Sequence, residues 1–128
     1  MKKDNTKNNK SIQSIQKNKN ITLIIEGIRE KKGQDIVLID LKNIMHSPCS
    51  LFVICTATSK IHINAIANNI EKLLLDELKL KAWNQEGRAS NWRLIDYLDI
   101  VVHILKEETR EYYKLEELWG DGIIKKFN

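Results

Sequence analysis

Histidines and cysteines are the side chains of this chain best suited to metal binding or nucleophilic chemistry. His62 and His103 each stand alone among apolar or hydroxyl-bearing neighbours, a setting in which a histidine usually has a structural role. Five residues separate Cys49 from Cys55, whereas zinc sites usually pair cysteines two to four residues apart. The sequence has no Cys-x-x-Cys and no His-x-x-x-His pair. We therefore predict no metal and no cofactor.

Aspartates near predicted strands are the candidates for phosphoryl transfer. Two-metal transfer needs carboxylates gathered about a magnesium pair, usually an Asp-x-Asp or Asp-x-Glu pair that follows a Gly-Ser helix start. Here Asp40 stands alone, and Asp96 and Asp99 are three positions apart. The pair Thr58-Ser59, which precedes a helical pattern, has no glycine. The chain is therefore predicted not to be an enzyme.

Positive charge is concentrated at the N-terminal end of the chain. The net charge is +4 at pH 7, and residues 1–20 hold six lysines against one aspartate. Those residues carry too few apolar side chains to offset the entropy of ordering a backbone, so we expect a disordered tail. The segment from Asp96 to Asp121 contains eight acidic and three basic residues. An acidic domain suits a basic protein partner, while RNA binding through the lysine-rich tail stays open as an alternative.

The expected location is the bacterial cytoplasm. Cys55 lies inside the apolar run 51–55, where a thiol usually packs as a small hydrophobe in a reducing compartment. No apolar run approaches the roughly 18 residues that span a bilayer, and the N-terminal end lacks the hydrophobic region of a secretory signal. We therefore expect no membrane partner.

Hydrophobic periodicity predicts one α/β domain over residues 21–121. Apolar stripes with helical spacing begin after Asn20 and after Thr58 or Ser59, which are suitable N-caps. β-Branched runs without polar alternation predict strands covered on both faces. The predicted elements are helices 21–32, 59–78 and 108–119, strands 36–39, 51–55, 81–83, 92–96 and 100–105, and a polar loop at 84–90. They form a mixed sheet of about five strands flanked by helices, and residues 122–128 are predicted to trail off as a C-terminal tail.

The segment from Trp92 to Trp119 carries a family signature. Its first half contains Trp92, Asp96-Tyr97, Asp99, Val101-Val102 and His103, and its second half is the run 107–121, EETREYYKLEELWGD. Shorter matches lie upstream at Gly33-Gln34-Asp35-Ile36, Asp40, 52–56, Thr58-Ser59, His62 and 65–67. In these residues the chain resembles the Iojap-like ribosomal silencing factors. Two positions depart from the family pattern: Ile61 replaces an arginine, and Leu98 replaces a glycine, so that a turn with positive φ at Leu98 would be strained.

The resemblance implies a fold similar to nucleotidyltransferases without their activity. It also implies binding to ribosomal protein L-fourteen on the joining face of the large subunit. A factor bound there would sterically block joining of the small subunit and repress translation under nutrient limitation, with a role in large-subunit maturation as a further implication. A nucleotidyltransferase-like enzyme, suggested by fold alone, stays as an alternative.

We expect the partner-binding site on the hairpin of strands 92–96 and 100–105. Trp92, Leu94 and Tyr97 are expected to present an apolar patch, and Asp96 and Asp99 to surround it with charge complementary to a basic protein. Such a patch also predicts a homodimer when the protein is free.

The helix after the hairpin is expected to be a scaffold. Its helical spacing predicts that Tyr112, Leu115, Leu118 and Trp119 face the core while its glutamates face solvent.

Overall fold

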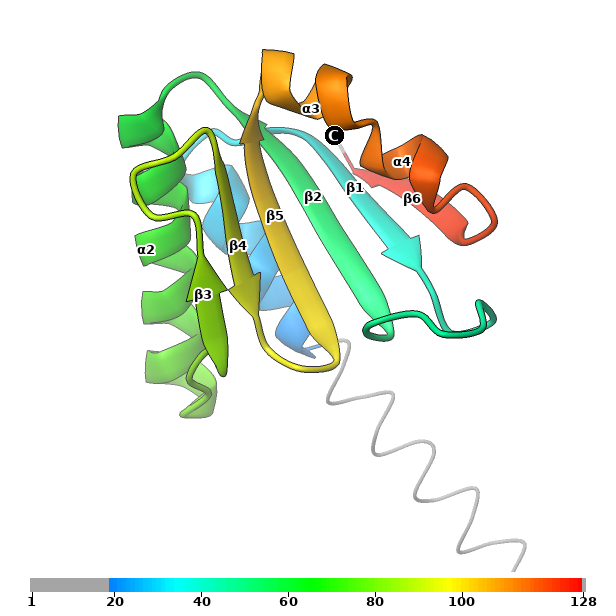
Figure 1. Cartoon of the computed structure of the whole chain (residues 1–128). Coiled ribbons are helices and arrows are strands. Elements are labelled where there is room, and N and C mark those ends of the chain that lie inside the picture. The colour runs from blue at the N-terminus through cyan, green and yellow to red at the C-terminus, as the bar shows by residue number, and fades with distance from the viewer. Residues whose placement is uncertain (1–18, 128) are drawn as a thin grey trace, which may run out of the picture.

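A computed structural model of the chain describes residues 19–127. The predicted disorder of residues 1–18 lies outside this range. A first helix covers residues 19–30. It is followed by β1 (Gln34–Asp40), β2 (Leu51–Ala57), α2 (Lys60–Leu78), β3 (Asn84–Glu86), β4 (Trp92–Asp96), β5 (Ile100–Lys106), α3 (Glu107–Tyr113), α4 (Leu115–Leu118) and β6 (Ile123–Phe127) (Figure 1).

The strands form one sheet in the order β3-β4-β5-β2-β1-β6. β2 and β5 run parallel, and all other neighbouring pairs are antiparallel. A parallel pair needs a long crossover connection, and the segment that contains α2, β3 and β4 supplies it. The predicted α/β class with a mixed sheet flanked by helices is confirmed, although the sheet has six strands and not about five.

The additional strand is β6, at residues predicted to be a C-terminal tail. It pairs antiparallel with β1, from Ile36 opposite Phe127 to Asp40 opposite Ile123. The prediction of a tail over residues 123–127 is therefore wrong. Lysines occupy two of the five positions of β6, and lysine is common on edge strands because it discourages further pairing.

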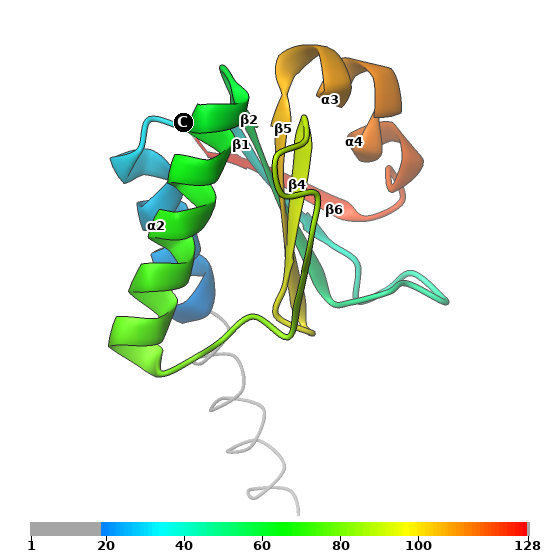
Figure 2. The same ribbon diagram turned by 60° about the vertical axis from the view of Figure 1, so that its left-hand side comes forward.

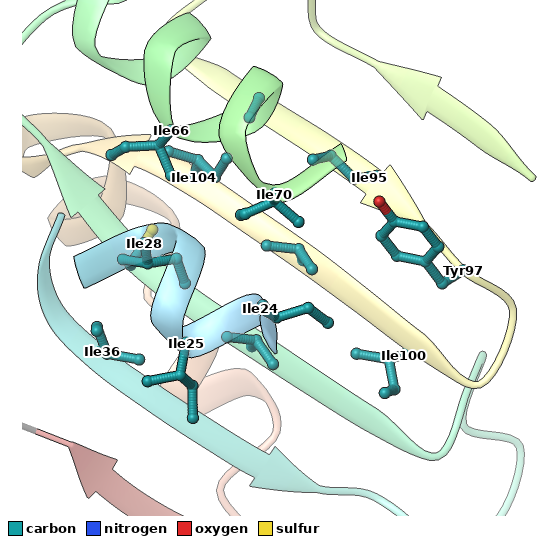
Figure 3. Close-up of a cluster of buried hydrophobic side chains, with 14 of the residues drawn as sticks. Ile24, Ile25, Ile28, Ile36, Ile66, Ile70, Ile95, Tyr97, Ile100 and Ile104 are labelled. Carbon is teal, nitrogen blue, oxygen red and sulfur yellow. The ribbon is translucent and has the colours of Figure 1, made fainter. Parts of the chain in front are cut away.

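Helices cover both faces of the sheet (Figure 2). On one face the first helix and α2 pack their isoleucines against the strands, as Figure 3 shows. On the other face a smaller cluster includes Phe52, Ile54 and Leu105 and is partly covered by Leu115 and Trp119. Every residue of β2 is buried, which is why its sequence shows no polar alternation.

Of the N-caps predicted for the two longer helices, that of α2 is correct and that of the first helix is wrong. Ser59 is the N-cap of α2, where its side chain accepts a hydrogen bond from the backbone N–H of His62, and the helix ends at Leu78 as predicted. The first helix already includes residue 19, so the prediction that Asn20 is its N-cap is wrong. Residues 19 and 20 belong to the domain and not to the N-terminal tail.

The strand predicted at 81–83 lies three residues later, at β3. Leu80 and Ala82 pack against the isoleucine core without joining the sheet. Pairing begins after Trp83, whose backbone N–H bonds to the carbonyl of Asp96, and Asn84 then lies opposite Asp96. Ala82 of the predicted strand therefore serves packing, Trp83 is exposed, and the polar loop predicted from residue 84 begins with the strand itself.

The single helix predicted at 108–119 is broken into α3 and α4. Lys114 has a left-handed backbone, with φ of 49°, and separates the two. Because the break changes the direction of the chain, Tyr112 and Leu118 are 79% and 70% exposed, and their predicted core position is wrong. Leu115 is buried and Trp119 packs against the same cluster, as predicted.

Candidate functional site

The hairpin of β4 and β5 holds the residues predicted to bind a partner. Along β4, Arg93 and Ile95 are buried, whereas Trp92, Leu94 and Asp96 are partly exposed. Successive side chains of a strand point to opposite faces. Trp92, Leu94 and Asp96 therefore lie in a row on the face of the sheet that carries α3 and α4.

Tyr97 does not share that row, so its predicted place in the exposed patch is wrong. It is buried in the isoleucine core on the α2 side (Figure 3). Burial raises the pKa of its hydroxyl, which has no hydrogen-bond partner among the described residues. Asp99 is exposed in the β4–β5 turn. The structure thus places Trp92, Leu94 and Asp96 on one face of the hairpin and Asp99 in its turn, whereas Tyr97 belongs to the core on the opposite face.

Trp92 is fixed in place by a histidine and a tyrosine. Its indole Nε1–H donates to Nδ1 of His103 over 3.0 Å, and its ring lies 4.9 Å from the ring of Tyr113. The His103 ring also meets the Phe52 ring edge-on at 4.6 Å. Burial lowers the pKa of His103 to about 4, so the imidazole is neutral and can accept. These contacts give His103 the structural setting that was predicted for it.

A groove of about 530 Å³ runs beside Trp92. It lies between the β3–β4 loop and α3, and residues that line it include Gly87, Ser90, Trp92, Leu94, Thr109 and Tyr113. The loop depends on Gly87, which has φ of +81° and whose hypothetical Cβ would lie only 1.9 Å from the Trp92 carbonyl oxygen. The Ser90 hydroxyl lies 2.7 Å from the carbonyl oxygens of both Gly87 and Trp92. A rigid loop therefore forms one wall of the groove.

The other end of β4 closes in a tight turn. The Asp96 carboxylate accepts the backbone N–H of Leu98 at 2.7 Å, and the Asp99 N–H donates to the Tyr97 carbonyl at 3.0 Å. Leu98, the position where the family pattern has glycine, is the centre of the turn and has φ of 73°. The strained turn considered from the sequence is thus present.

Arg110 ties α3 to the sheet, and the sequence did not single it out. Its Nη1 donates to the Asp35 carbonyl at 2.6 Å and to the Thr56 hydroxyl at 2.9 Å, and its Nε pairs with Glu116 at 3.0 Å. Glu107, Glu111 and Glu117 are exposed, in agreement with the predicted solvent-facing acids of this region. The only signal for Arg110 was its place in the family signature.

A second arginine, Arg93, is buried and supports the opposite side of the hairpin. Arg93 lies within 3.3 Å of Glu71 on α2 and also donates to Asn64 and Gln85. Its burial lowers its pKa. The network joins β3 and β4 to α2, and strand alternation was the signal that could have placed Arg93 on the inner face.

The residues considered for chemistry are occupied by structural contacts. Nδ1 of His62 accepts the backbone N–H of Thr58 at 2.9 Å, and its Nε2 donates to the Lys31 carbonyl at 2.6 Å. The Asp40 carboxylate accepts the backbone N–H of Lys42. Both cysteines are free thiols, and burial raises the pKa of Cys49 to about 11 and that of Cys55 to about 12.

The described residues, 19–127, hold neither a metal-binding cluster nor a membrane-spanning helix. Among these residues no three His, Cys, Asp or Glu side chains gather closely enough to hold a metal ion. No helix within the same range has the length and apolar character needed to cross a membrane.

Comparisons with known proteins agree with this geometry. The profile of the family described as "Ribosomal silencing factor during starvation" matches residues 13–127. A ribosomal silencing factor of Halalkalibacterium halodurans is 33% identical over 80% of this chain and 86% of its own length, and that of Bacillus subtilis is 37% identical over 73% and 78%. A mouse protein named for mitochondrial assembly of the ribosomal large subunit is 31% identical over 77% of this chain and 44% of its own.

The fold is shared as well. A crystal structure of a Chromobacterium violaceum protein superposes with a TM-score of 0.74 at 31% identity and covers 80% of this chain and 85% of that one. The family profile extends across the hairpin and the whole domain that supports it. The chain belongs to the ribosomal silencing factor family.

Proposed function

We propose that the protein binds the large ribosomal subunit through ribosomal protein L-fourteen and sterically blocks joining of the small subunit. Translation is thereby repressed under nutrient limitation, in the bacterial cytoplasm. The observation that carries this proposal is the row of Trp92, Leu94 and Asp96 on the outer face of β4, in a chain that belongs to the ribosomal silencing factor family.

The hairpin has the features of a protein-docking surface. Trp92 is partly exposed yet held by His103 and Tyr113, so little side-chain entropy is lost when a partner covers it. Anchored aromatic residues beside a groove are typical binding hot spots, each worth about 2 kcal/mol or more when truncated. Asp96 and Asp99 add negative charge at the other end of the same hairpin, which favours a lysine- or arginine-rich partner and speeds association at low salt.

Occlusion requires binding and no catalysis, and the proposed role is therefore not enzymatic. The alternative of nucleotidyl transfer rests on fold alone. A turnover assay with nucleotides and magnesium tests it directly, because robust metal-dependent transfer would replace the occlusion mechanism.

Substitution of Trp92 is the direct test of the proposal. We expect Trp92→Ala to weaken pull-down of purified large subunits by about tenfold or more. It should also restore 70S formation in a sucrose-gradient joining assay. Leu75→Ala, on the exposed side of α2, is the matched control and should behave like the parent protein. Circular dichroism shows whether each variant is folded, and equal binding by folded Trp92→Ala would remove the hairpin from the interface.

The lysine-rich tail provides the competing RNA model. Deleting residues 2–18 leaves all described elements in place and removes five lysines. We expect the shortened protein to bind large subunits as the full chain does. Loss of binding by the folded, shortened protein would make tail-mediated contact with ribosomal RNA the main interaction.

A role in large-subunit maturation is a second candidate function, favoured by the mouse relative, which is named for assembly of the mitochondrial ribosomal large subunit. If it applies, cells without the gene should accumulate incomplete large subunits in sucrose gradients during growth in rich medium. Occlusion alone predicts altered subunit joining during starvation and normal subunits in rich medium.

Self-association of the free protein would use the same partly apolar surface. Sedimentation of the free protein at increasing concentration tests this proposal. A dimer formed through the hairpin should dissociate when large subunits are added and should be weakened by Trp92→Ala.

A further inference from the structure

Leucine at position 98 of the β4–β5 turn is explained neither by the backbone conformation at that position nor by packing of its side chain. Leu98 has φ of 73°, in the left-handed region that is costly for leucine and freely available to glycine. Its side chain is nevertheless 57% exposed. A turn with these dihedral angles would form more readily with glycine, and the core would lose little.

The turn holds Leu98 in this conformation from several sides. The Asp96 carboxylate binds the Leu98 N–H, and the Asp99 N–H binds the Tyr97 carbonyl. The Asp99 carbonyl in turn accepts the N–H groups of both Ser50 and Leu51 at 3.0 Å. Contacts of this kind are what keep a strained residue in place. The leucine side chain is therefore presented from a rigid tip.

The surroundings of the tip are apolar and acidic. Asp96 and Asp99 lie on either side of Leu98 in the turn. Trp83, which is 69% exposed, is joined to the hairpin through its N–H bond to the Asp96 carbonyl. The β1–β2 connection, which carries the exposed Met45, reaches the same end of the sheet (Figure 1). The exposed side chains of Leu98 and Trp83 are thus displayed at the end of the hairpin that carries the carboxylates of Asp96 and Asp99.

We propose that Leu98 is a specificity-determining anchor of the docking surface. Its side chain enters an apolar depression on the ribosomal protein, and Asp96 and Asp99 face lysine or arginine side chains at the rim of that depression. This inference rests on the proposed function and adds to it a contact that a glycine at this position cannot make. Two carboxylates beside the anchor repel phosphate, so the occupant is a protein surface and not RNA.

If Leu98 is an anchor, replacing it should lower affinity for the large subunit without lowering the stability of the protein. Leu98→Gly relieves the left-handed strain but also gives the unfolded chain more freedom, so the melting temperature should stay the same or rise by up to about 4 °C. Affinity for purified large subunits should fall by about tenfold or more, as for loss of a central apolar anchor. Leu98→Met keeps an apolar side chain on the same backbone and should bind within about threefold of the parent.

The full-length protein and its variants are compared by thermal unfolding and by equilibrium binding at one fixed salt concentration. The probes are purified large subunits and deproteinised RNA from the same subunits. Leu75→Ala is the control for loss of an exposed leucine elsewhere and should leave binding unchanged. Support for the anchor is weaker binding of Leu98→Gly to subunits, without a lower melting temperature and with Leu98→Met close to the parent.

Other outcomes overturn the anchor in distinguishable ways. If Leu98→Gly binds like the parent while Trp92→Ala is weakened, the anchor is wrong and the proposed function stands. If the parent itself does not bind large subunits, the proposed function fails and the anchor fails with it. A melting temperature of Leu98→Gly lowered by more than about 4 °C would assign the leucine to folding. Equal loss of binding to the deproteinised RNA would make the occupant RNA.

Discussion

The two faces of the sheet are lined by different kinds of side chain. The face under the first helix and α2 is an aliphatic core made mostly of isoleucine, leucine and valine. The face under α3 and α4 has fewer buried aliphatic residues. It includes a row of four rings in which Trp92 contacts His103, His103 contacts Phe52, and Phe52 contacts Trp119. One face is thus filled and closed by long helices, whereas the other is closed only in part and keeps side chains at its margin that a partner can reach.

From this difference we expect stability to depend mainly on one face and the proposed recognition on the other. Aliphatic packing is non-directional and scales with the area removed from water. Aromatic and imidazole side chains also carry directional contacts, such as the Trp92–His103 hydrogen bond, which fix a surface residue in one orientation. Substitutions on the α2 side should therefore change the free energy of unfolding strongly and the affinity per folded molecule little.

The largest expected effect comes from the aliphatic face. Ile66 on α2 is completely buried, and Ile66→Ala should lower the free energy of unfolding by about 3 to 4 kcal/mol because it leaves a cavity. Urea denaturation followed by circular dichroism measures the change. Leu115→Ala, on the opposite face of the sheet, should lower the free energy of unfolding by about 2 kcal/mol. Ile61→Ala, at an exposed site of α2, is the control and should lower it by less than about 0.5 kcal/mol. A larger loss for Leu115 than for Ile66 would reverse the assignment.

The next effect is a pH dependence confined to the aromatic face. His103 keeps a pKa of about 4 in the folded protein, against 6.5 for the free side chain. Between pH 6.5 and 4 the unfolded chain binds a proton that the folded protein does not, so stability falls as the pH falls through this window. The contribution approaches about 3 kcal/mol at most.

The pH effect is measured by chemical denaturation at several pH values. His103→Phe should flatten the dependence between pH 7 and 4, because the difference between the two proteins isolates this histidine from the carboxylates. Parallel pH profiles for the two proteins would show that His103 titrates normally.

A smaller effect is expected from the polar network that joins the hairpin to α2. Glu71→Ala leaves the buried Arg93 without its carboxylate while Asn64 and Gln85 still accept its hydrogen bonds. Since Glu71 is itself partly exposed, we expect a loss of about 2 kcal/mol, below the cost of breaking a fully buried pair. Glu77→Ala, at an exposed position of the same helix, is the matched control and should change stability by less than about 0.5 kcal/mol.

The smallest effect tests the outer side of α3. Tyr112→Ala should change the free energy of unfolding by less than about 0.5 kcal/mol, because the side chain is mostly exposed. Thermal unfolding is sufficient to measure this. A loss above about 1.5 kcal/mol would return Tyr112 to the core and extend the aromatic face beyond the residues assigned to it.

Most of the fold was predictable because its central elements are repetitive. β2 and β5 are mostly apolar and β-branched and show no polar alternation, which is what strands covered on both faces require. Ser59 with the apolar stripe behind it marked α2 correctly. The strand β6 was missed because Ile123 and Ile124 are followed directly by two lysines, a pattern that does not distinguish an edge strand from a solvated tail. The break at Lys114 was missed because a lysine gives no local signal for a left-handed backbone.

The candidate site was predictable in its position along the chain and less so in its orientation. Family resemblance led to the hairpin, but the resemblance carries no information about which side of a strand a residue occupies. Strict alternation along β4 would have separated Tyr97 from Trp92 and Leu94, since odd and even positions point to opposite faces. Arg93 and Arg110 were missed because their partners Glu71 and Asp35 are distant in sequence, so that only the tertiary structure brings them together.

The parallel pairing of β2 with β5 has a consequence for how the protein is made. Leu51 lies opposite Ile100, so at about 5 to 20 residues per second the ribosome needs several seconds to supply the second strand. During that time one edge of a strand that is entirely buried in the folded protein has no neighbour. Nascent chains of this protein therefore pass through an interval of vulnerability to aggregation, which ends when the hairpin that carries the candidate binding surface joins the sheet.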